Sequence, residues 1–127
     1  MLVNQIAVFL ENKKGTLNGL MQTLADNNVN VKSLNIADTS DFGIVRLVTD
    51  DNDYAVKVIK ENNYIVKTND LLGIEVEDKP GMLSKTLELM AANGVEIEYI
   101  YSYTLANGKT LILVKPDDME KAQALVK

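Results

Sequence analysis

Carboxylates and lysines are the first side chains to consider as the acids, bases or nucleophiles of a catalytic centre in this chain. The 127-residue sequence has no histidine and no cysteine, which excludes Ser-His-Asp and Cys-His catalysis and every metal site built on those residues. The acidic run Asp50–Asp53 lacks the glycine and the distal glutamate of a calcium loop, so capping of a helix explains it better. Glu75 and Glu77 share a strand face and do not oppose each other across a cleft. We therefore predict no catalytic residue, no metal, no cofactor and no enzyme activity.

A short segment that occurs twice is the most informative local feature. Glu11–Leu17 reads ENKKGTL and Glu77–Leu83 reads EDKPGML, so both place a lysine and a glycine just ahead of a helical pattern. Glycine lets the backbone approach a ligand closely, and the free N–H groups of a helix start attract an anion such as a carboxylate. The glycine could equally serve only to make a tight turn between strand and helix. The pattern alone leaves both interpretations open.

These two segments belong to an internal repeat that covers nearly the whole chain. Residues 71–127 align with residues 5–61 at a constant offset of 66 and without a gap; identical pairs include Gly15/Gly81, Asn27/Asn93, Leu47/Leu113 and Asp51/Asp117. Such a repeat indicates one small fold made twice. We expect units at residues 1–69 and 70–127. Each has roughly 60 residues, near the lower limit for an independent core, so we expect them to share buried surface.

Each copy contains the pattern of a ferredoxin-like unit. Apolar residues alternate in 5–11 and 71–77, which predicts strands, and recur at helical spacing in 17–24 and 83–91. Two further strands follow, at 30–38 and 44–49 or at 96–104 and 110–115. A change of apolar parity within the first of these predicts a β-bulge in both copies.

A second helix then opens on Asp50/Asp51 or Pro116/Asp117, and Tyr64–Lys67 closes the first unit as a strand. The order is βαββαβ, an α+β fold with its helices on one face of an antiparallel sheet. The last strand of the second unit is missing from the sequence: either the chain is truncated or that edge is supplied from elsewhere.

Composition narrows the range of partners. The net charge of −5 argues against nucleic acid or an anionic membrane as the main partner. No apolar run approaches the ~20 residues of a membrane span, and the N-terminus shows no signal-peptide pattern. The lack of cysteine fits a cytoplasmic protein. The expected central strands offer no platform of aromatic residues for RNA.

With this fold and repeat, the sequence resembles the ACT-domain family of small-molecule sensors. Asp78–Leu83 (DKPGML) matches that family's D-x-P-G-x-L loop, whereas the first copy has Lys14 in place of the proline. The runs Ile36–Arg46 and Val95–Tyr103 support the comparison, and the whole chain is similar to the stand-alone tandem ACT proteins of bacteria.

The resemblance implies that ACT units associate and bind an amino acid where they meet. In this fold the second strand of each unit lies at a sheet edge, and an uncovered edge invites pairing. We therefore expect the second strands of the two copies to join in one continuous antiparallel sheet, with the ligand between a loop of one unit and a second strand of its neighbour. The candidate ligand-binding residues are Asn12, Gly15, Thr16, Leu17, Asp78, Gly81, Met82 and Leu83 in the loops, and Asn35, Ile36, Ala37, Tyr101, Ser102 and Tyr103 in the strands.

Three functions remain to be separated. The leading hypothesis is a non-catalytic sensor that binds a small amino acid and regulates a partner enzyme. The alternative is a regulatory subunit of a biosynthetic enzyme, like the small chain of acetohydroxyacid synthase, acting mainly through protein contacts. The third is an enzyme that uses carboxylates and lysines alone. Apolar Ala7, Phe9 and Ile44 on the open sheet face suggest that this face is covered by homodimerisation. Tyr99, Tyr101 and Tyr103 alternate onto one face of their strand, where we expect them to pack against a partner sheet or a helix.

Overall fold

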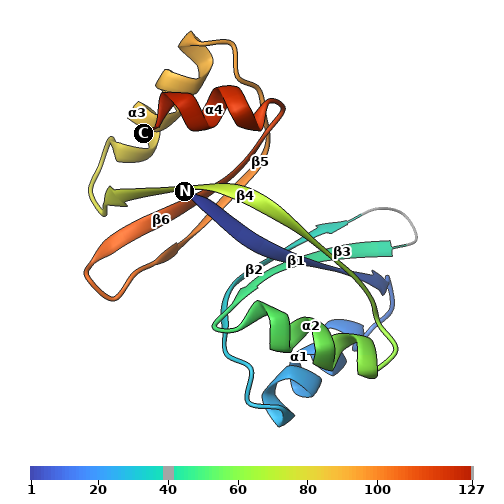
Figure 1. Ribbon diagram of the computed structural model, residues 1–127. Helices are drawn as coiled ribbons and strands as arrows, with labels where there is room; N and C mark the ends of the chain where they lie inside the picture. The colour runs from blue at the N-terminus through green and yellow to red at the C-terminus, as the bar shows by residue number, and fades with distance from the viewer. Residues whose placement is uncertain (39–41, 127) are drawn as a thin grey trace. The chain divides into compact units, whose positions relative to one another are not determined.

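The computed structural model describes residues 1–38 and 42–126, and within them it has six strands and four helices (Figure 1). The element order is βαββαβαββα, and the printed strand pairs are antiparallel, so the α+β prediction is confirmed. None of the described helices is long and apolar enough to cross a membrane. In chain order the elements are β1 (Leu2–Glu11), α1 (Thr16–Asp26), β2 (Val31–Asp38), β3 (Phe42–Thr49), α2 (Asn52–Glu61), β4 (Ile65–Glu77), α3 (Met82–Ala92), β5 (Ile97–Thr104), β6 (Lys109–Pro116) and α4 (Met119–Leu125).

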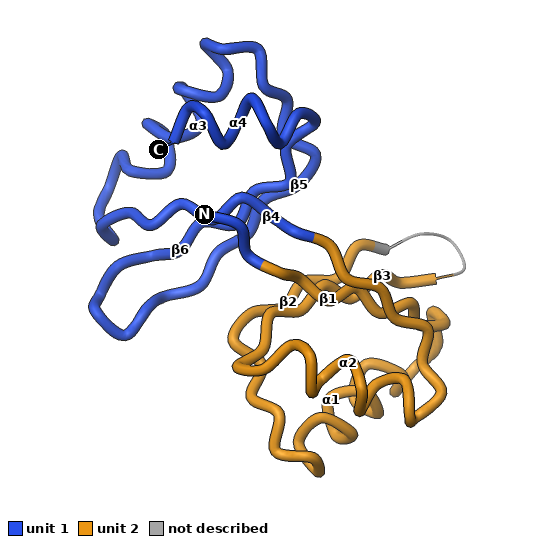
Figure 2. Tube along the Cα trace, viewed as in Figure 1, with its two compact units in different colours: residues 1–3, 70–127 blue, residues 4–69 orange. Residues whose placement is uncertain are grey.

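The chain divides into two compact units (Figure 2). We call residues 4–69 the N-terminal unit, drawn in orange, and residues 1–3 with 70–127 the C-terminal unit, drawn in blue. Strand β4 runs without interruption from Ile65 to Glu77, where the sequence predicted a closing strand at Tyr64–Lys67 and a separate strand from Leu71. Its first residues therefore belong to one unit and its remainder to the other.

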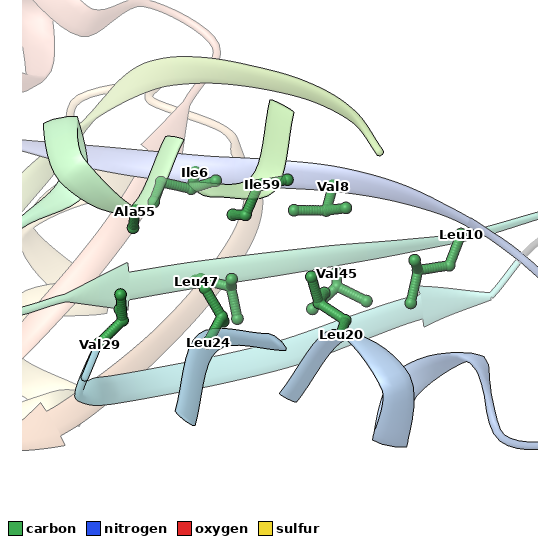
Figure 3. Close-up of a cluster of buried hydrophobic side chains, with 10 residues drawn as sticks. All are labelled: Ile6, Val8, Leu10, Leu20, Leu24, Val29, Val45, Leu47, Ala55 and Ile59. Carbon is green, nitrogen blue, oxygen red and sulfur yellow. The ribbon is translucent and has the colours of Figure 1, made fainter. Parts of the chain in front are cut away.

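The N-terminal unit has a single apolar core on one face of its strands (Figure 3). Alternate residues of β1 and β3 face α1 and α2, because successive side chains of a strand point to opposite sides. Leu20 and Leu24 of α1 and Ile59 of α2 meet them from the helical layer. The core residues from the strands and the segment before β2 are Ile6, Val8, Leu10, Val29, Val45 and Leu47.

The C-terminal unit repeats this arrangement with its own residues. Its buried cluster comprises Leu72, Met90, Val95, Ile112, Val114 and Ala122, from β4, α3, the segment before β5, β6 and α4. Strand β6 lies between β4 and β5, and all three are antiparallel. The strand at the far side of β4 comes from the start of the chain.

Met1–Val3 take the position of a fourth strand in the C-terminal unit. The Gly73 N–H donates to the Met1 carbonyl oxygen at 2.7 Å, and the Met1 nitrogen donates back to the Gly73 carbonyl oxygen at 3.1 Å. A mutual pair of this kind is the mark of antiparallel pairing. The edge that the second copy lacks in sequence is thus supplied by residues of the same chain.

The predicted bulges are confirmed, and they lie at equivalent places. The register shifts between Val31 and Ser33 in β2, and between Ile97 and Tyr99 in β5. Val31 and Ile97 are 66 residues apart, as are Ser33 and Tyr99, which agrees with the offset of the sequence repeat.

The gapless repeat, by contrast, is wrong beyond the first hairpin. Leu34 pairs with Leu47 in the N-terminal unit, and its counterpart Ile100 pairs with Val114 in the C-terminal unit. The offset is therefore 66 up to β2 and β5 but 67 from β3 and β6 onward, because the β5–β6 hairpin is one residue longer. The identical pair Leu47/Leu113 is not structurally equivalent: Leu47 belongs to its unit's core cluster, whereas Leu113 does not belong to the corresponding cluster.

The expected pairing between the two second strands is also wrong. The strand order is β2-β3-β1-β4-β6-β5, so β2 and β5 are its outermost strands. The reason is that β1 and β4 each carry residues of both units, which makes these two strands the central neighbours.

Candidate functional site

The two repeated loops have the same backbone. Gly15 (φ 88°, ψ −5°) and Gly81 (φ 90°, ψ −14°) adopt the left-handed conformation directly before α1 and α3. Glycine populates this region without the steric cost that a Cβ brings, which explains its presence in both copies. Matching backbone bonds close the loops: the Lys13 N–H donates to the Glu11 carbonyl oxygen at 2.8 Å, and the Lys79 N–H to that of Glu77 at 3.0 Å.

The residue after the glycine distinguishes the loops. The Thr16 hydroxyl lies within hydrogen-bond distance of the carbonyl oxygens of Glu11 (3.0 Å) and Lys13 (2.9 Å), so it ties the N-terminal loop to itself. Met82 has the equivalent position in the C-terminal unit and has no hydroxyl to donate. Its side chain instead lines a pocket.

This pocket, which we call the β5 pocket, has a volume of about 290 Å³ and lies within the C-terminal unit. The β4–α3 loop, the first turn of α3 and strands β5 and β6 surround it. Apolar side chains dominate its wall, and Ile112 is almost fully buried whereas Ile100 and Leu83 are partly exposed. Its lining residues are Val76, Glu77, Asp78, Lys79, Met82, Leu83, Ile100, Tyr101, Ser102, Thr110 and Ile112.

Polar groups gather at the loop side of the β5 pocket. Lys79 Nζ lies 3.0 Å from Glu77 Oε2, and both side chains are largely exposed. Helix α3 has no side-chain cap, and its geometry leaves the N–H groups of Leu83 and Ser84 without an acceptor inside the helix. The pocket therefore combines acidic groups, a helix start and an apolar wall.

Some of the predicted residues of the C-terminal unit meet in the β5 pocket. Asp78, Met82 and Leu83 line it from the loop and helix, and Tyr101 and Ser102 from β5. Gly81 makes the turn without lining it. Tyr103 lies further along β5, outside the lining, and burial raises the pKa of its phenol.

In the N-terminal unit the structure does not gather the predicted residues in one place. Gly15 and Thr16 line a separate pocket of about 620 Å³, which we call the phenylalanine pocket. Its lining does not include Asn12, Leu17, Asn35, Ile36 or Ala37. Leu17 packs against the N-terminal core, and Ile36 is 48% exposed on the edge strand β2.

Sequence reasoning missed several residues of the β5 pocket. Ile100 and Ile112 form much of its apolar wall, and Val76, Lys79 and Thr110 were also not predicted. The signal was present in the alternation of β5 and β6. Ser102 pairs with Ile112 and Ile100 with Val114, a core residue, so these residues share the face that α3 covers.

Aspartates of the two acidic runs cap helices or accept hydrogen bonds from backbone N–H groups. Asp51 Oδ1 accepts from the Tyr54 N–H and caps α2, as predicted for the first run. The cap of α4 is Asp118, not Asp117, because the longer hairpin shifts the second copy by one residue. Asp117 Oδ1 instead accepts from the Glu96 N–H. Over residues 1–38 and 42–126 no group of three or more acidic side chains is placed to hold a metal ion.

Comparison with known proteins identifies the family. Residues 1–127 match the model of an ACT domain pair, so the chain belongs to the ACT domain family. A protein from Bacteroides thetaiotaomicron with a crystal structure is 38% identical in sequence to this chain. The two structures superpose with a TM-score of 0.87 over 98% of this chain and 86% of that one. No protein in a search of curated sequences matches.

The chain also resembles two regulatory subunits of aspartate kinase. The ligand-free subunit from Thermus thermophilus is 14% identical, and that from Thermus flavus is 16% identical. Each superposes with a TM-score of 0.64 over 99% of this chain and 93% of the other. At these identities the likeness shows a shared fold.

Proposed function

We propose that this ACT domain pair is a non-catalytic regulatory module that binds an amino acid in the β5 pocket. The observation that carries the proposal is the position of that pocket. It lies where the Asp78–Leu83 loop, the best match to the family's loop, meets the second strand of its unit. Met82 lines the pocket beside this loop. In the N-terminal loop the equivalent residue, Thr16, donates its hydroxyl to carbonyl oxygens of the same loop, which is why we favour the C-terminal loop.

The polar groups suit the two charges of an amino acid. The N–H groups of Leu83 and Ser84 are oriented by helix α3, and the positive end of a helix favours a carboxylate. Asp78 supplies negative charge for the ammonium group, whereas Glu77 is already paired with Lys79. The side chain of the ligand then faces the apolar wall formed by Ile100 and Ile112.

A neighbouring ACT unit would complete the site. Strand β5 is an outer strand, and edge strands invite pairing with another chain. We propose that a second copy of the protein pairs at this edge, as a homodimer that closes the β5 pocket over its ligand. A partner enzyme would then sense the ligand through the stability or shape of that junction.

The direct test is thermal shift and calorimetry against each of the twenty amino acids. A ligand that binds only the native state at 100 times its Kd stabilises it by about 2.7 kcal/mol, which such a scan detects. We expect Ile100→Glu to abolish the effect, because it places a carboxylate in the apolar wall. Leu34→Glu is the matched control at the equivalent position of the N-terminal unit and should leave binding intact.

The alternatives predict other results. If no amino acid stabilises the protein or releases heat, the sensor proposal is wrong. Co-purification with a stoichiometric enzyme subunit in that case would support a subunit that acts through protein contacts. Light scattering of the free and ligand-bound protein tests the homodimer separately.

A further inference from the structure

Both phenylalanines of the chain lie in one pocket at the surface of the N-terminal unit. The sequence contains two, Phe9 and Phe42, and both line the phenylalanine pocket. Phe42 is 50% exposed, and the neighbouring Ile65 is 67% exposed. Aromatic rings normally supply buried area to a core. Their presence here, outside the core cluster of the unit, makes this surface a candidate binding site.

The pocket forms where three segments of the N-terminal unit meet. In the register of β1 and β3, Phe9 pairs with Ile44 and Glu11 with Phe42, so the rings come from neighbouring strands. The segment after α2 adds Tyr64 and Ile65, and the β1–α1 loop adds Lys13 and Lys14. The complete lining is Phe9, Leu10, Glu11, Lys13, Lys14, Gly15, Thr16, Gly19, Phe42, Asn63, Tyr64 and Ile65.

Lysine side chains line the phenylalanine pocket and the hollow beside it. Lys67 Nζ lies 5.7 Å from the centroid of the Phe9 ring, within the range of a cation–π contact, and it lines an adjoining hollow with Phe9 and Phe42. Lys13 Nζ forms an ion pair with Glu11 Oε2 at 2.8 Å. Lys14 and Lys67 therefore give this part of an otherwise acidic protein a local positive excess.

The C-terminal unit lacks this combination. With the offsets of 66 and 67, Glu75 takes the place of Phe9, Lys109 that of Phe42, and Pro80 that of Lys14. The fold itself therefore does not require these rings or this charge. The pocket is also not the N-terminal version of the β5 pocket, because the counterparts of the β5 wall, Leu34–Ile36, do not line it.

We propose that the phenylalanine pocket binds a small aromatic anion. The planar ring of the ligand stacks on Phe9 and Phe42. A carboxylate or phosphate group attached to that ring pairs with Lys14 and Lys67. The volume lies within the usual range of small-molecule sites. The lysines favour a small anion over a protein partner, because lysine is depleted in the core of protein interfaces.

The experiment titrates the intact protein with two aromatic anions, adenosine 5′-monophosphate and indole-3-acetate, by calorimetry. Adenosine and inorganic phosphate are the matched probes for the first anion, and indole and acetate are those for the second; each carries only the ring or only the charge. We expect one of the two anions to bind at least tenfold more tightly than either half-probe, with an affinity that falls as salt rises. Which of them binds distinguishes a phosphate from a carboxylate ligand.

Substitutions test whether the anion binds in the phenylalanine pocket. Phe42→Ala and Lys14→Ala should each weaken binding at least tenfold, whereas Lys109→Ala, at the position equivalent to Phe42 in the other unit, should not. A circular dichroism melt verifies that each variant is folded. The proposal is overturned if neither anion binds, if the ring-only probe of the anion that binds has an equal affinity, or if Phe42→Ala leaves the affinity unchanged. Self-association that is lost in Phe42→Ala without added anion would also overturn it and would identify an interface between copies.

Discussion

Gly73 of β4 lies directly against Val3 of β1: a Cβ atom added to Gly73 would be 2.6 Å from Val3 Cγ2. Together with the backbone bonds between Gly73 and Met1, this contact holds the first residues of the chain in the C-terminal unit. The glycine is needed here for close approach rather than for an unusual backbone angle. Its counterpart in the first copy is Ala7.

We predict that Gly73→Ala destabilises the protein by about 1–3 kcal/mol, the typical cost of overpacking a filled site. Urea unfolding measures the loss. Gly43→Ala is the matched control, because a Cβ there would meet Ile36 Cγ2 at an ordinary 3.5 Å. The double variant Val3→Ala/Gly73→Ala should recover part of the loss, since the clash is with the Val3 side chain. Equal stability of Gly73→Ala and Gly43→Ala would contradict the close packing of Val3.

The helix caps give a second prediction. Asp51 accepts from the Tyr54 N–H, and Asp118 accepts from the Lys121 N–H, each at 3.1 Å. Asp51→Ala and Asp118→Ala should each cost about 0.5–2 kcal/mol, because the first turn of the helix loses an acceptor. Asp53→Ala in the first turn of α2 is the control and should cost less in the same urea experiment. A larger loss for Asp53→Ala than for Asp51→Ala would show that the cap is assigned to the wrong residue.

Much of the fold could be predicted from the sequence, because local patterns of apolar residues determine the strands and helices. The alternation of Ile6, Val8 and Leu10 predicted a strand with one buried face, and the parity change after Val31 predicted a bulge; both are present. The longer second hairpin was not readable, because Leu113 and Val114 preserve the apolar character of Leu47 and Val48 at the wrong offset. Only the strand register shows that Leu47 corresponds to Val114.

The strand order and the site were predicted less well, for a physical reason. Pairing between distant segments leaves no periodic trace, so the role of Met1–Val3 beside Gly73 could not be read from the sequence. The Asp78–Leu83 loop was recognisable from its residue types. The wall opposite it was not, because Ile100 and Ile112 read as ordinary strand residues until their register is known.

The ion pair at the edge of the phenylalanine pocket predicts a pH dependence. The hydrogen bond from Lys13 lowers the pKa of the Glu11 carboxyl below 4.5, and the bond to Glu11 raises the pKa of the Lys13 ammonium above 10.5. The contribution of Glu11 to stability is therefore present above its unfolded-state pKa and is lost as the pH falls through the lowered value. That of Lys13 is present below its unfolded-state pKa and is lost as the pH rises through the raised value.

An NMR titration of the Glu11 carboxyl carbon measures this shift. We expect its midpoint below the ordinary value of a glutamate, and we expect Lys13→Met to raise it, because the hydrogen bond and charge of Lys13 lower the pKa of the Glu11 carboxyl. Lys14→Met is the control, since the ion pair joins Glu11 to Lys13. Both groups are exposed, so the effect on stability should be small and weaker at high salt. A midpoint that is unchanged by Lys13→Met would rule out the pairing in solution.

The two loops predict that proline is tolerated in both copies. Lys14 and Pro80 precede glycines whose φ angles are 88° and 90°, and the loops share their backbone bonds. Those shared bonds use the N–H groups of residues 13, 16 and 19 and their counterparts, so a proline at position 14 breaks none of them. We expect Lys14→Pro to stabilise the protein by about 0.4–1 kcal/mol, because proline restricts the unfolded chain. Pro80→Lys should lose a similar amount, and the urea midpoints of the two variants should move in opposite directions. Destabilisation by Lys14→Pro would show that the loops differ in backbone despite their matching glycines.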